Sequence, residues 1–368
     1  MICTSLRLIE IRNFEDKEIE PSPALTILTG DNGCGKTNII EALYYASIGK
    51  SFRTSNDGEI IRIGKDEGSI LMDFTAHETT QTIKVRFSRN QGKKIFLNDT
   101  PIRRKELMGI FRTVLFTPDE LQLIKGAPQL RRRFIDTEIS QVSPRYYEEF
   151  LRYTRAVQQR NAALKQSLLS GKEPDLDMWD MQIASSASYI VRKRLETISK
   201  MDGTVNSMEE ALTGNREHLE ILYKQQGSDT PRFDMEWYME ELTKRRDEDR
   251  RFCHTSIGPH RDDLSFLMNG LDLSAYGSQG QQRTAILSMK LSEMEFVKEE
   301  TGEYPILLLD DIGSELDRNR REALIQFLMK RNIQTIVTGT DLPFQVEGKI
   351  IQIKGRAPSP VQRAPRWL

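Results

Sequence analysis

The most chemically informative stretch of the sequence is a glycine-rich loop that follows a short apolar run. Residues 25–43 read LTILTGDNGCGKTNIIEAL, and Lys36 and Thr37 open a helical pattern. Backbone N–H groups of such a turn converge on an anion, and the N-terminus of the next helix adds partial positive charge. The lysine would reach the β- and γ-phosphates of a nucleotide, and the threonine hydroxyl would hold Mg²⁺. The predicted nucleotide-binding residues are Gly30, Asp31, Asn32, Gly33, Cys34, Gly35, Lys36, Thr37 and Asn38.

Two carboxylates end a second apolar run, near the C-terminal end of the chain. The run YPILLLDD closes on Asp310 and Asp311 and is typical of a strand buried on both faces. An acid at the carboxyl end of a central strand points into the crevice beside a phosphate loop, so Asp310 can complete a Mg²⁺ shell with Thr37. Asp311 is placed to orient or deprotonate an attacking water. With Lys36, it is a predicted catalytic residue of an ATPase.

A second candidate anion site precedes a long helical pattern. Ser278 supplies a hydroxyl, Gly280 permits close approach of the backbone, and the helix N-terminus adds its dipole. Gln279 and Gln281 complete the motif. The same four residues also suit a plain helix cap. If they bind phosphate, one chain carries two half-sites for a nucleotide.

Composition bounds the function classes. The chain has 368 residues, 38% hydrophobic and 29% charged, with a net charge of -1, so a DNA-binding surface must be local. No apolar run reaches the length of a membrane span, and the N-terminus is too charged for a secretory signal. We expect a cytoplasmic protein without a membrane partner. Three cysteines without CxxC spacing and four scattered histidines predict neither disulfides nor a zinc site. Cys34 is either an oxidisable thiol or a small residue that fills a tight turn.

Apolar patterning predicts an α/β chain with a helical insertion. Segments before about residue 99 alternate like strands, and the RNQGKK turn should join two of them as a hairpin. From 103 to 252 the pattern turns helical, and a long helix starts with Ser143 as its cap and Pro144 in its first turn. After residue 304, strand, helix and strand follow in the order of a parallel, doubly wound sheet.

Together these motifs resemble those of ABC-type ATPases of the SMC-like branch. GDNGCGKTN, SQGQQR, LLLDD and SELD are similar to the phosphate loop, signature, Walker B and D-loop of that branch. Longer matches resemble the RecF family of recombinational repair proteins. They include NIIEALYYASIGKSFRT, LFTPDELQLIKGAPQLRRRFID and GPHRDDL, and run in the family's order from about residue 6 to residue 341.

The resemblance implies a fold and a division of the chain. It implies a P-loop ABC-type ATPase head with a strand-rich N-terminal layer and an inserted helical lobe. Residues 1–115 and 300–355 would form the ATPase lobe, and 116–299 the helical lobe with the signature motif. Residues 356–368 contain prolines and arginines and are expected to be a flexible tail.

The resemblance also implies roles for the motifs. ATP and Mg²⁺ would bind the phosphate loop of one chain, and the signature residues would contact the γ-phosphate from a partner chain. ATP would then hold together a homodimer with two composite sites. The D-loop across the same interface would consist of Ser314, Glu315, Leu316 and Asp317.

The biological role implied by the resemblance is ATP-dependent binding of gapped or duplex DNA. RecO and RecR are the implied partners, and RecA is implied indirectly, as the protein that is loaded in place of single-strand-binding protein. Hydrolysis would be slow and stimulated by DNA. Arg131, Arg132 and Arg133 are the candidate DNA contacts, although such a run can also be a solvated face.

Some positions depart from the ABC pattern or allow two interpretations. Thr338, Thr340 and Asp341 stand where many relatives carry a histidine after Walker B, so the γ-phosphate sensor is not identified. Gly277 replaces an expected alanine, a change predicted to loosen the approach to Ser278. Arg53 is either a nucleotide-side contact or a surface arginine.

Two other function classes share parts of this pattern. A transporter-type ATPase subunit would use the same loop and signature, but the large helical insertion and the GPHRDDL segment disfavour it. A P-loop small-molecule kinase would use the loop, but it has no use for a signature half-site.

Overall fold

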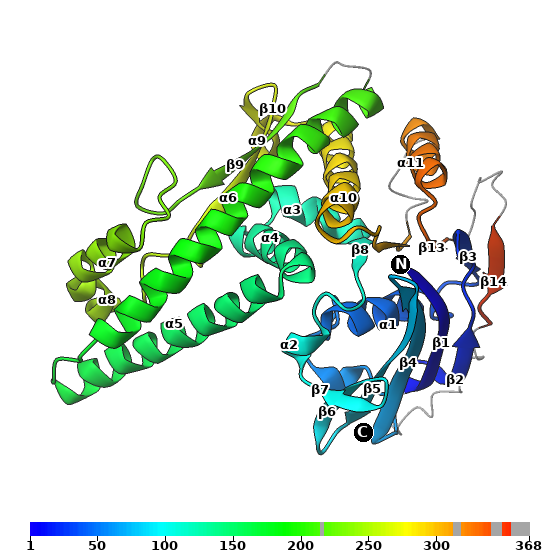
Figure 1. Ribbon diagram of the computed structural model, residues 1–368, viewed down its shortest axis with the longest axis horizontal. Coiled ribbons are helices and arrows are strands. Elements are labelled where there is room, and N and C mark those ends of the chain that lie inside the picture. The colour runs from blue at the N-terminus through cyan, green and yellow to red at the C-terminus, as the bar shows by residue number, and fades with distance from the viewer. Residues whose placement is uncertain (214–216, 312–317, 340–347, 355–368) are drawn as a thin grey trace, which may run out of the picture.

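The protein is described by a computed structural model over residues 1–213, 217–311, 318–339 and 348–354. Figure 1 shows two parts. Most strands and α1 gather at the right, whereas the long helices α5 and α6 extend to the left, with β9 and β10 beside α6. Within the described ranges, no helix combines the length and apolar character needed to cross a membrane.

A five-stranded sheet positions the candidate site. Its order is β14-β3-β13-β12-β8, and every neighbouring pair is parallel. Leu307 and Leu309 of β12 belong to one buried apolar cluster, whereas Ile306 and Leu308 belong to the other. Successive side chains of a strand point to opposite faces, so both faces of this sheet are covered. The predicted doubly wound sheet is confirmed. Its elements are β3 (Leu25–Thr29), α1 (Lys36–Ile48), β8 (Thr113–Phe116), β12 (Ile306–Leu309), α11 (Arg318–Arg331), β13 (Thr335–Thr338) and β14 (Lys349–Gln352).

A six-stranded antiparallel sheet forms the N-terminal layer, in the order β2-β1-β4-β5-β6-β7. The predicted hairpin is present, since Ser88 of β5 pairs with Gly92 of β6. The apolar faces of this sheet and of α1 share one buried cluster. Its elements are β1 (Ile2–Ile11), β2 (Phe14–Ile19), η1 (Asp57–Glu59), β4 (Glu67–Ala76), β5 (Thr79–Ser88), β6 (Gly92–Leu97), β7 (Thr100–Ile102) and α2 (Arg104–Leu107).

The helical part begins where β8 ends. The predicted cap is confirmed, because the Ser143 hydroxyl accepts a hydrogen bond from the backbone N–H of Tyr146. Tyr146, Tyr153 and Leu164 of α5 are buried along one stripe, while Leu168 at its end is 58% exposed. The helices are η2 (Pro118–Glu120), α3 (Leu121–Lys125), α4 (Pro128–Val142), α5 (Pro144–Ser170), α6 (Asp177–Thr213), α7 (Met235–Lys244), α8 (Arg246–Phe252), α9 (Leu273–Tyr276) and α10 (Gln279–Thr301).

The helical prediction for residues 103–252 was incomplete. A three-stranded antiparallel sheet lies within the helical part, in the order β11-β10-β9. The strands are β9 (Leu219–Lys224), β10 (Asp263–Met268) and β11 (Leu271–Asp272). β9 is only six residues long and pairs with a strand some forty residues later in the chain, so no local hairpin signal announces it.

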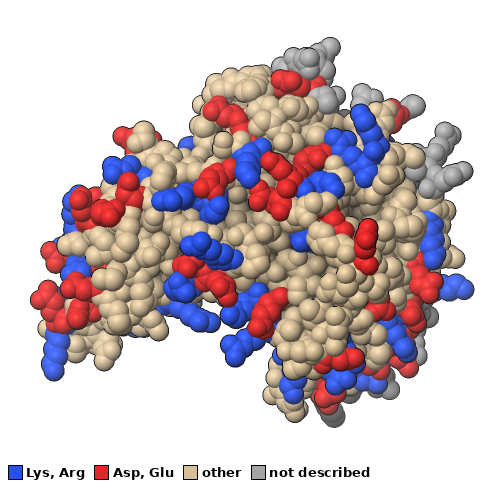
Figure 2. Space-filling model, viewed as in Figure 1, with Lys and Arg blue, Asp and Glu red and all other residues tan. Residues whose placement is uncertain are grey.

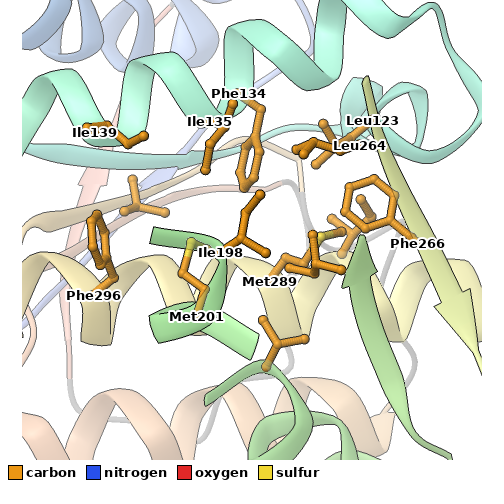
Figure 3. Packing of buried hydrophobic residues seen from close by; sticks show 14 of the residues in the cluster. Leu123, Phe134, Ile135, Ile139, Ile198, Met201, Leu264, Phe266, Met289 and Phe296 are labelled. Carbon is orange, nitrogen blue, oxygen red and sulfur yellow. The ribbon is translucent and has the colours of Figure 1, made fainter. Parts of the chain in front are cut away.

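The core of the helical part is built around α10. Phe134 of α4, Ile198 and Met201 of α6 and Phe266 of β10 lie in one buried cluster with Met289 of α10 (Figure 3). The same buried cluster continues to Leu309 and Val337 of the parallel sheet. The helix that begins at the signature motif therefore packs directly against the layer that carries Asp310.

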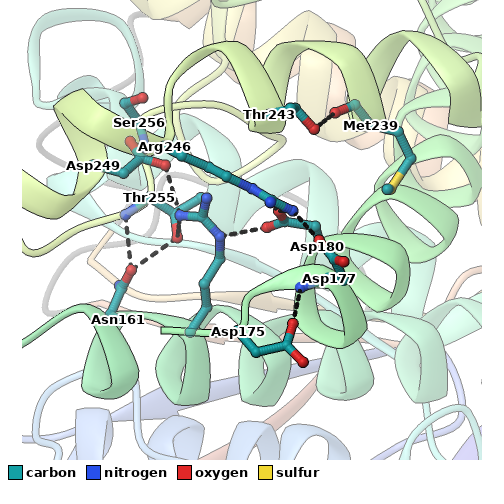
Figure 4. Close-up of polar contacts among 11 residues, drawn as sticks. Asn161, Asp175, Asp177, Asp180, Met239, Thr243, Arg246, Asp249, Thr255 and Ser256 are labelled. Atoms are coloured by element: carbon teal, nitrogen blue, oxygen red, sulfur yellow. Dashed lines mark hydrogen bonds and ion pairs between the residues drawn. The ribbon is translucent and has the colours of Figure 1, made fainter. Parts of the chain in front are cut away.

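A buried ion network fixes the far end of the helical part (Figure 4). The Arg160 guanidinium is fully buried and donates to Asp180 and Asp249, each at 2.6 Å. Arg246 donates to the other oxygen of Asp180. These contacts tie α5, α6 and α8 together. Removing one partner from such a network leaves a buried charge uncompensated.

Candidate functional site

The glycines of the predicted phosphate loop occupy conformations that other residues adopt with strain. Gly30 has φ 144°, and a Cβ there would lie 2.3 Å from the carbonyl oxygen of Ile353. Gly35 has φ 111°, and a Cβ there would lie 2.6 Å from Asn13 Oδ1 and Phe14 Cζ. Side chains at these two positions would displace the loop. Cys34 between them is 2% exposed, so it fills the turn.

A side chain outside the motif holds the loop. Asn13 Nδ2 donates to the Cys34 carbonyl at 2.7 Å, and Asn13 Oδ1 accepts from Asn38 Nδ2 at 2.8 Å. Sequence reasoning missed Asn13, because it lies in the turn between β1 and β2, before the glycine-rich segment. Lys36 Nζ donates to the carbonyls of Gly30 and Asp31 at 2.6 and 3.1 Å. The lysine therefore folds back over the mouth of the loop.

The structure brings together the hydroxyl and carboxylate predicted to hold Mg²⁺. Thr37 Oγ1 donates to Asp310 Oδ1 at 3.0 Å, and Thr338 Oγ1 donates to the same oxygen at 2.8 Å. Burial raises the pKa of Asp310, while the hydrogen bonds from Thr338 and Thr37 lower it. Hydroxyl and carboxylate oxygens are the hard ligands that Mg²⁺ prefers, so these residues fit the ion.

Asp311 lies beside this pair in an uncommon backbone conformation. Its φ is 50°, and its backbone N–H donates to Thr338 Oγ1 at 2.8 Å. The Thr338 hydroxyl thus connects both carboxylate residues, accepting from one and donating to the other. A non-glycine residue in the left-handed region costs free energy, and the bond to Thr338 offsets part of that cost.

Arg53 is connected to the phosphate loop through Asn38. Its Nη1 donates to Asn38 Oδ1 at 2.7 Å and lies 3.4 Å from the buried Glu41 carboxylate. Glu41 also accepts two hydrogen bonds from Arg12. With 42% of its side chain exposed, Arg53 is held near the loop while remaining open to solvent.

The signature residues form a capping box at the start of α10. Ser278 Oγ accepts from the Gln281 backbone N–H at 3.2 Å, and Gln281 Oε1 accepts from the Ser278 N–H at 2.8 Å. Gln281 Nε2 donates to Glu217 of the helical part. Ser278 and Gln279 are exposed. The plain helix-cap interpretation is therefore correct as far as it goes, and the exposed hydroxyl is compatible with phosphate binding as well.

The structure explains why residue 277 is a glycine. A Cβ at this position would lie 2.5 Å from Leu273 Cδ1 and 2.6 Å from the Leu273 carbonyl oxygen. Glycine lets the chain pass close over α9 and enter the capping box. In this fold, the absence of a side chain accompanies tight packing before Ser278 and does not loosen it.

The three arginines predicted to contact DNA have different environments. Arg131 forms two hydrogen bonds with the Asp263 carboxylate and donates to the Gly126 carbonyl. Arg132 Nη1 donates to the Asp262 carbonyl at 2.7 Å. Both guanidinium groups thus join α4 to the start of β10. Arg133 is exposed and lines a cavity next to α1.

Several predicted residues lie outside the described ranges. They are the D-loop residues Ser314, Glu315, Leu316 and Asp317, the positions Thr340 and Asp341, and residues 356–368. Among the residues that the structure does describe, no group of three or more His, Cys, Asp or Glu side chains could hold a metal ion.

The parallel sheet, the phosphate loop and the carboxylates at the end of β12 define an ABC-type ATPase head. A family model described as the RecF/RecN/SMC N terminal domain matches residues 2–350. The chain belongs to the RecF family. It is 41% identical over 345 residues to the DNA replication and repair protein RecF of Alkaliphilus oremlandii, covering 92% of this chain and 93% of the relative. The RecF of Clostridium perfringens is 38% identical, with 93% and 94% covered.

Solved structures agree with this assignment. The recombination mediator protein RecF-ATPrS in the RecFOR pathway is 32% identical, with a TM-score of 0.88, and 96% of each chain is covered. The Smc head domain of Pyrococcus furiosus, bound to the C-terminal domain of ScpA, has a TM-score of 0.55 at 16% identity, covering 92% of this chain and 90% of that one. The second likeness concerns the fold alone.

Proposed function

We propose that the chain binds and slowly hydrolyses ATP, and that its nucleotide state controls how it holds DNA during recombinational repair. The contact between Thr37 Oγ1 and Asp310 Oδ1, at 3.0 Å, carries the proposal. Thr37 and Asp310 would hold Mg²⁺, the ion that supplies positive charge in phosphoryl transfer. The ion would neutralise charge that develops on the phosphates. Lys36 would bind the same phosphates, and Asp311 would orient the attacking water.

The second half of the ATP site would come from another copy of the chain. Ser278 is exposed at the start of a 23-residue helix, and among the residues that the structure describes its side chain bonds only within its own capping box. A γ-phosphate from a second copy can approach the hydroxyl and the helix N-terminus from solvent. Two chains related by a twofold axis would then close two composite sites.

Hydrolysis would open this dimer. ATP favours the closed state only through contacts that differ between the two states, and the γ-phosphate makes those contacts. Loss of the γ-phosphate removes the ligand of Ser278, Gly280 and Gln281. In this proposal DNA stimulates a slow turnover, so the closed dimer persists until DNA is engaged.

DNA is the proposed ligand of the closed dimer. The named relatives are DNA replication and repair proteins, and the similar solved structure belongs to the RecFOR pathway. By this similarity we propose gapped or duplex DNA as substrate, RecO and RecR as partners, and a contribution to loading RecA onto DNA covered by single-strand-binding protein. The match over nearly the whole chain favours this role over a transporter subunit or a small-molecule kinase.

The experiment is fluorescence anisotropy of a labelled gapped duplex, titrated with the protein at one fixed salt concentration. We expect tight binding with a non-hydrolysable ATP analogue and weak binding with ADP. The Lys36→Ala variant is the matched control, since it should bind DNA weakly with both nucleotides. Equal wild-type affinity with the analogue and ADP would contradict nucleotide gating.

A further inference from the structure

A cavity of about 370 Å³ lies beside α1, between it and α4. Its walls come from both parts of the molecule: Tyr44 and Phe52 from α1 and the segment after it, and Arg133 and Glu138 from α4. Figure 2 shows Lys and Arg side chains, with carboxylates among them, on both sides of the recess between the two parts. The function proposed above does not use this region.

Two positively charged side chains near this cavity, Lys93 and Arg104, bind backbone carbonyls at the end of α1. Lys93 Nζ donates to the Gly49 carbonyl at 2.7 Å, and Arg104 Nε donates to the Ile48 carbonyl at 2.9 Å. These are the last carbonyls of α1, where the helix dipole favours positive charge. Lys93 also pairs with Asp57 at 3.0 Å. Lys93 and Arg104 therefore cap the helix.

Two further cations have no such explanation. Lys50 and Arg133 are exposed, and in the part of the chain that the structure describes neither forms a hydrogen bond or ion pair. The pKa of Lys50 is lowered, chiefly by the charge of Arg104, then by burial, and then by Lys93 and Arg133. Arg133 lines the same cavity as Phe52, which follows Lys50 by two residues, so positive charges from α4 and from the sheet part lie near one another. A bound anion would relieve the repulsion between them.

Two of the carboxylates nearby are paired, and a third, Asp119, is exposed and lines the cavity. Glu120 and Lys290 line the cavity and pair at 3.4 Å, and Lys290 also pairs with the buried Glu293 at 3.1 Å. Glu138 is fully buried there, and its pKa is raised to about 7 by burial, so much of it is protonated near neutral pH. Arg133 on the cavity wall, with Lys50 and Arg104 at the end of α1, adds positive charge to this region.

We propose that Lys50 and Arg133 bind phosphates of the DNA backbone across the recess between the two parts. The inference rests on the proposed function and gives it a location. Exposed Lys and Arg side chains bind phosphates without reading sequence. A backbone that bridges Arg133 and Lys50 touches both parts at once, so it binds best in one arrangement of the two. Nucleotide-dependent changes in that arrangement would then change DNA affinity.

The test is the salt dependence of duplex binding by Lys50→Ala and Arg133→Ala, with the ATP analogue present. Each variant should bind about threefold to tenfold more weakly than wild type, and the slope of log affinity against log salt should become smaller by about one. Binding of a fluorescent ATP analogue should stay unchanged. Lys172→Ala, an exposed lysine in the loop between α5 and α6, is the matched control and should behave like wild type.

The outcomes separate this inference from the function on which it rests. If wild type bound duplex DNA and both variants had the same affinity and salt slope as wild type, the phosphate site would be wrong and the proposed function would stand. Absence of duplex binding by the wild type in every nucleotide state would overturn the proposed function as well. A third arm replaces chloride with inorganic phosphate at equal ionic strength. If phosphate binding were lost in the variants while DNA binding stayed intact, the site would take a small anion and the DNA assignment would be wrong.

Discussion

Thr338→Val is the substitution that most directly probes how the carboxylates are held. Thr338 is 2% exposed, and its hydroxyl donates to Asp310 and accepts from the Asp311 N–H, both at 2.8 Å. Valine has nearly the same shape, so packing should be kept. The substitution removes two hydrogen bonds without opening a cavity.

The magnitude follows from these two bonds. A buried group left without its partner costs about 1–3 kcal/mol, so the free energy of unfolding should fall by about that amount. Residues that orient a metal ligand typically change metal affinity or activity by about 10–100-fold when replaced. We therefore expect Mg²⁺-dependent ATP hydrolysis to need at least tenfold more Mg²⁺. The bond from Thr338 also lowers the pKa of Asp310, so the acid limb of the rate profile should move to higher pH.

The assay is steady-state ATP hydrolysis against Mg²⁺ concentration and pH, with thermal unfolding measured in parallel. Thr335→Val is the control on the same strand, because Thr335 is 1% exposed and its hydroxyl donates to the Ile333 carbonyl, away from the carboxylates. It should lower stability without changing the Mg²⁺ requirement. If Thr338→Val kept the wild-type Mg²⁺ requirement and pH profile, the assigned role of the hydroxyl would be wrong.

Two further predictions concern a buried and an exposed carboxylate. Burial raises the pKa of Glu138 to about 7, above its ordinary value of 4.5, so the folded state keeps a proton that the unfolded state releases and stability falls as pH rises across that interval. Glu138→Gln should remove this fall in stability. The variant should have a higher midpoint of thermal unfolding than wild type at about pH 8, and a similar midpoint near the ordinary pKa of glutamate. If the pH dependence of unfolding were unchanged in the variant, the raised pKa of Glu138 would be wrong. The Asp311→Asn variant should bind ATP and remain a closed dimer. Gel filtration with ATP should show a persistent dimer, and phosphate release should nearly stop. Normal turnover by the variant would exclude Asp311 from activating the attacking water.

Much of the fold could be predicted because the signals are local. The parallel sheet follows from continuous apolar runs, and the approach of Thr37 to Asp310 follows because the carboxyl ends of parallel strands meet at one edge. β9 escaped prediction since its partner strand is distant in sequence. The partners of Arg131 and Arg132 lie some 130 residues away in the sequence, so the sequence alone could not show that these two arginines are paired inside the fold.

The convergence of Lys50 and Arg133 is also a product of tertiary structure. Arg133 belongs to the arginine run that the sequence singled out, but no spacing rule relates it to Lys50. The packing of α4 beside α1 brings Arg133 to the cavity that Phe52, two residues after Lys50, also lines. Asn13 is a similar case, since a turn between two strands carries it to the phosphate loop. Contacts between side chains that are far apart in the sequence produce no periodic pattern from which they could be predicted.

The central claim is that the signature residues of one copy complete the ATP site of another, and Ser278→Arg tests it most directly. Sedimentation velocity with the non-hydrolysable ATP analogue should show wild type shifting to a dimer and Ser278→Arg remaining a monomer, while both bind a fluorescent ATP analogue equally. Ser170→Arg, an exposed serine at the end of α5, should dimerise like wild type. Dimerisation of Ser278→Arg with the analogue would contradict the composite site.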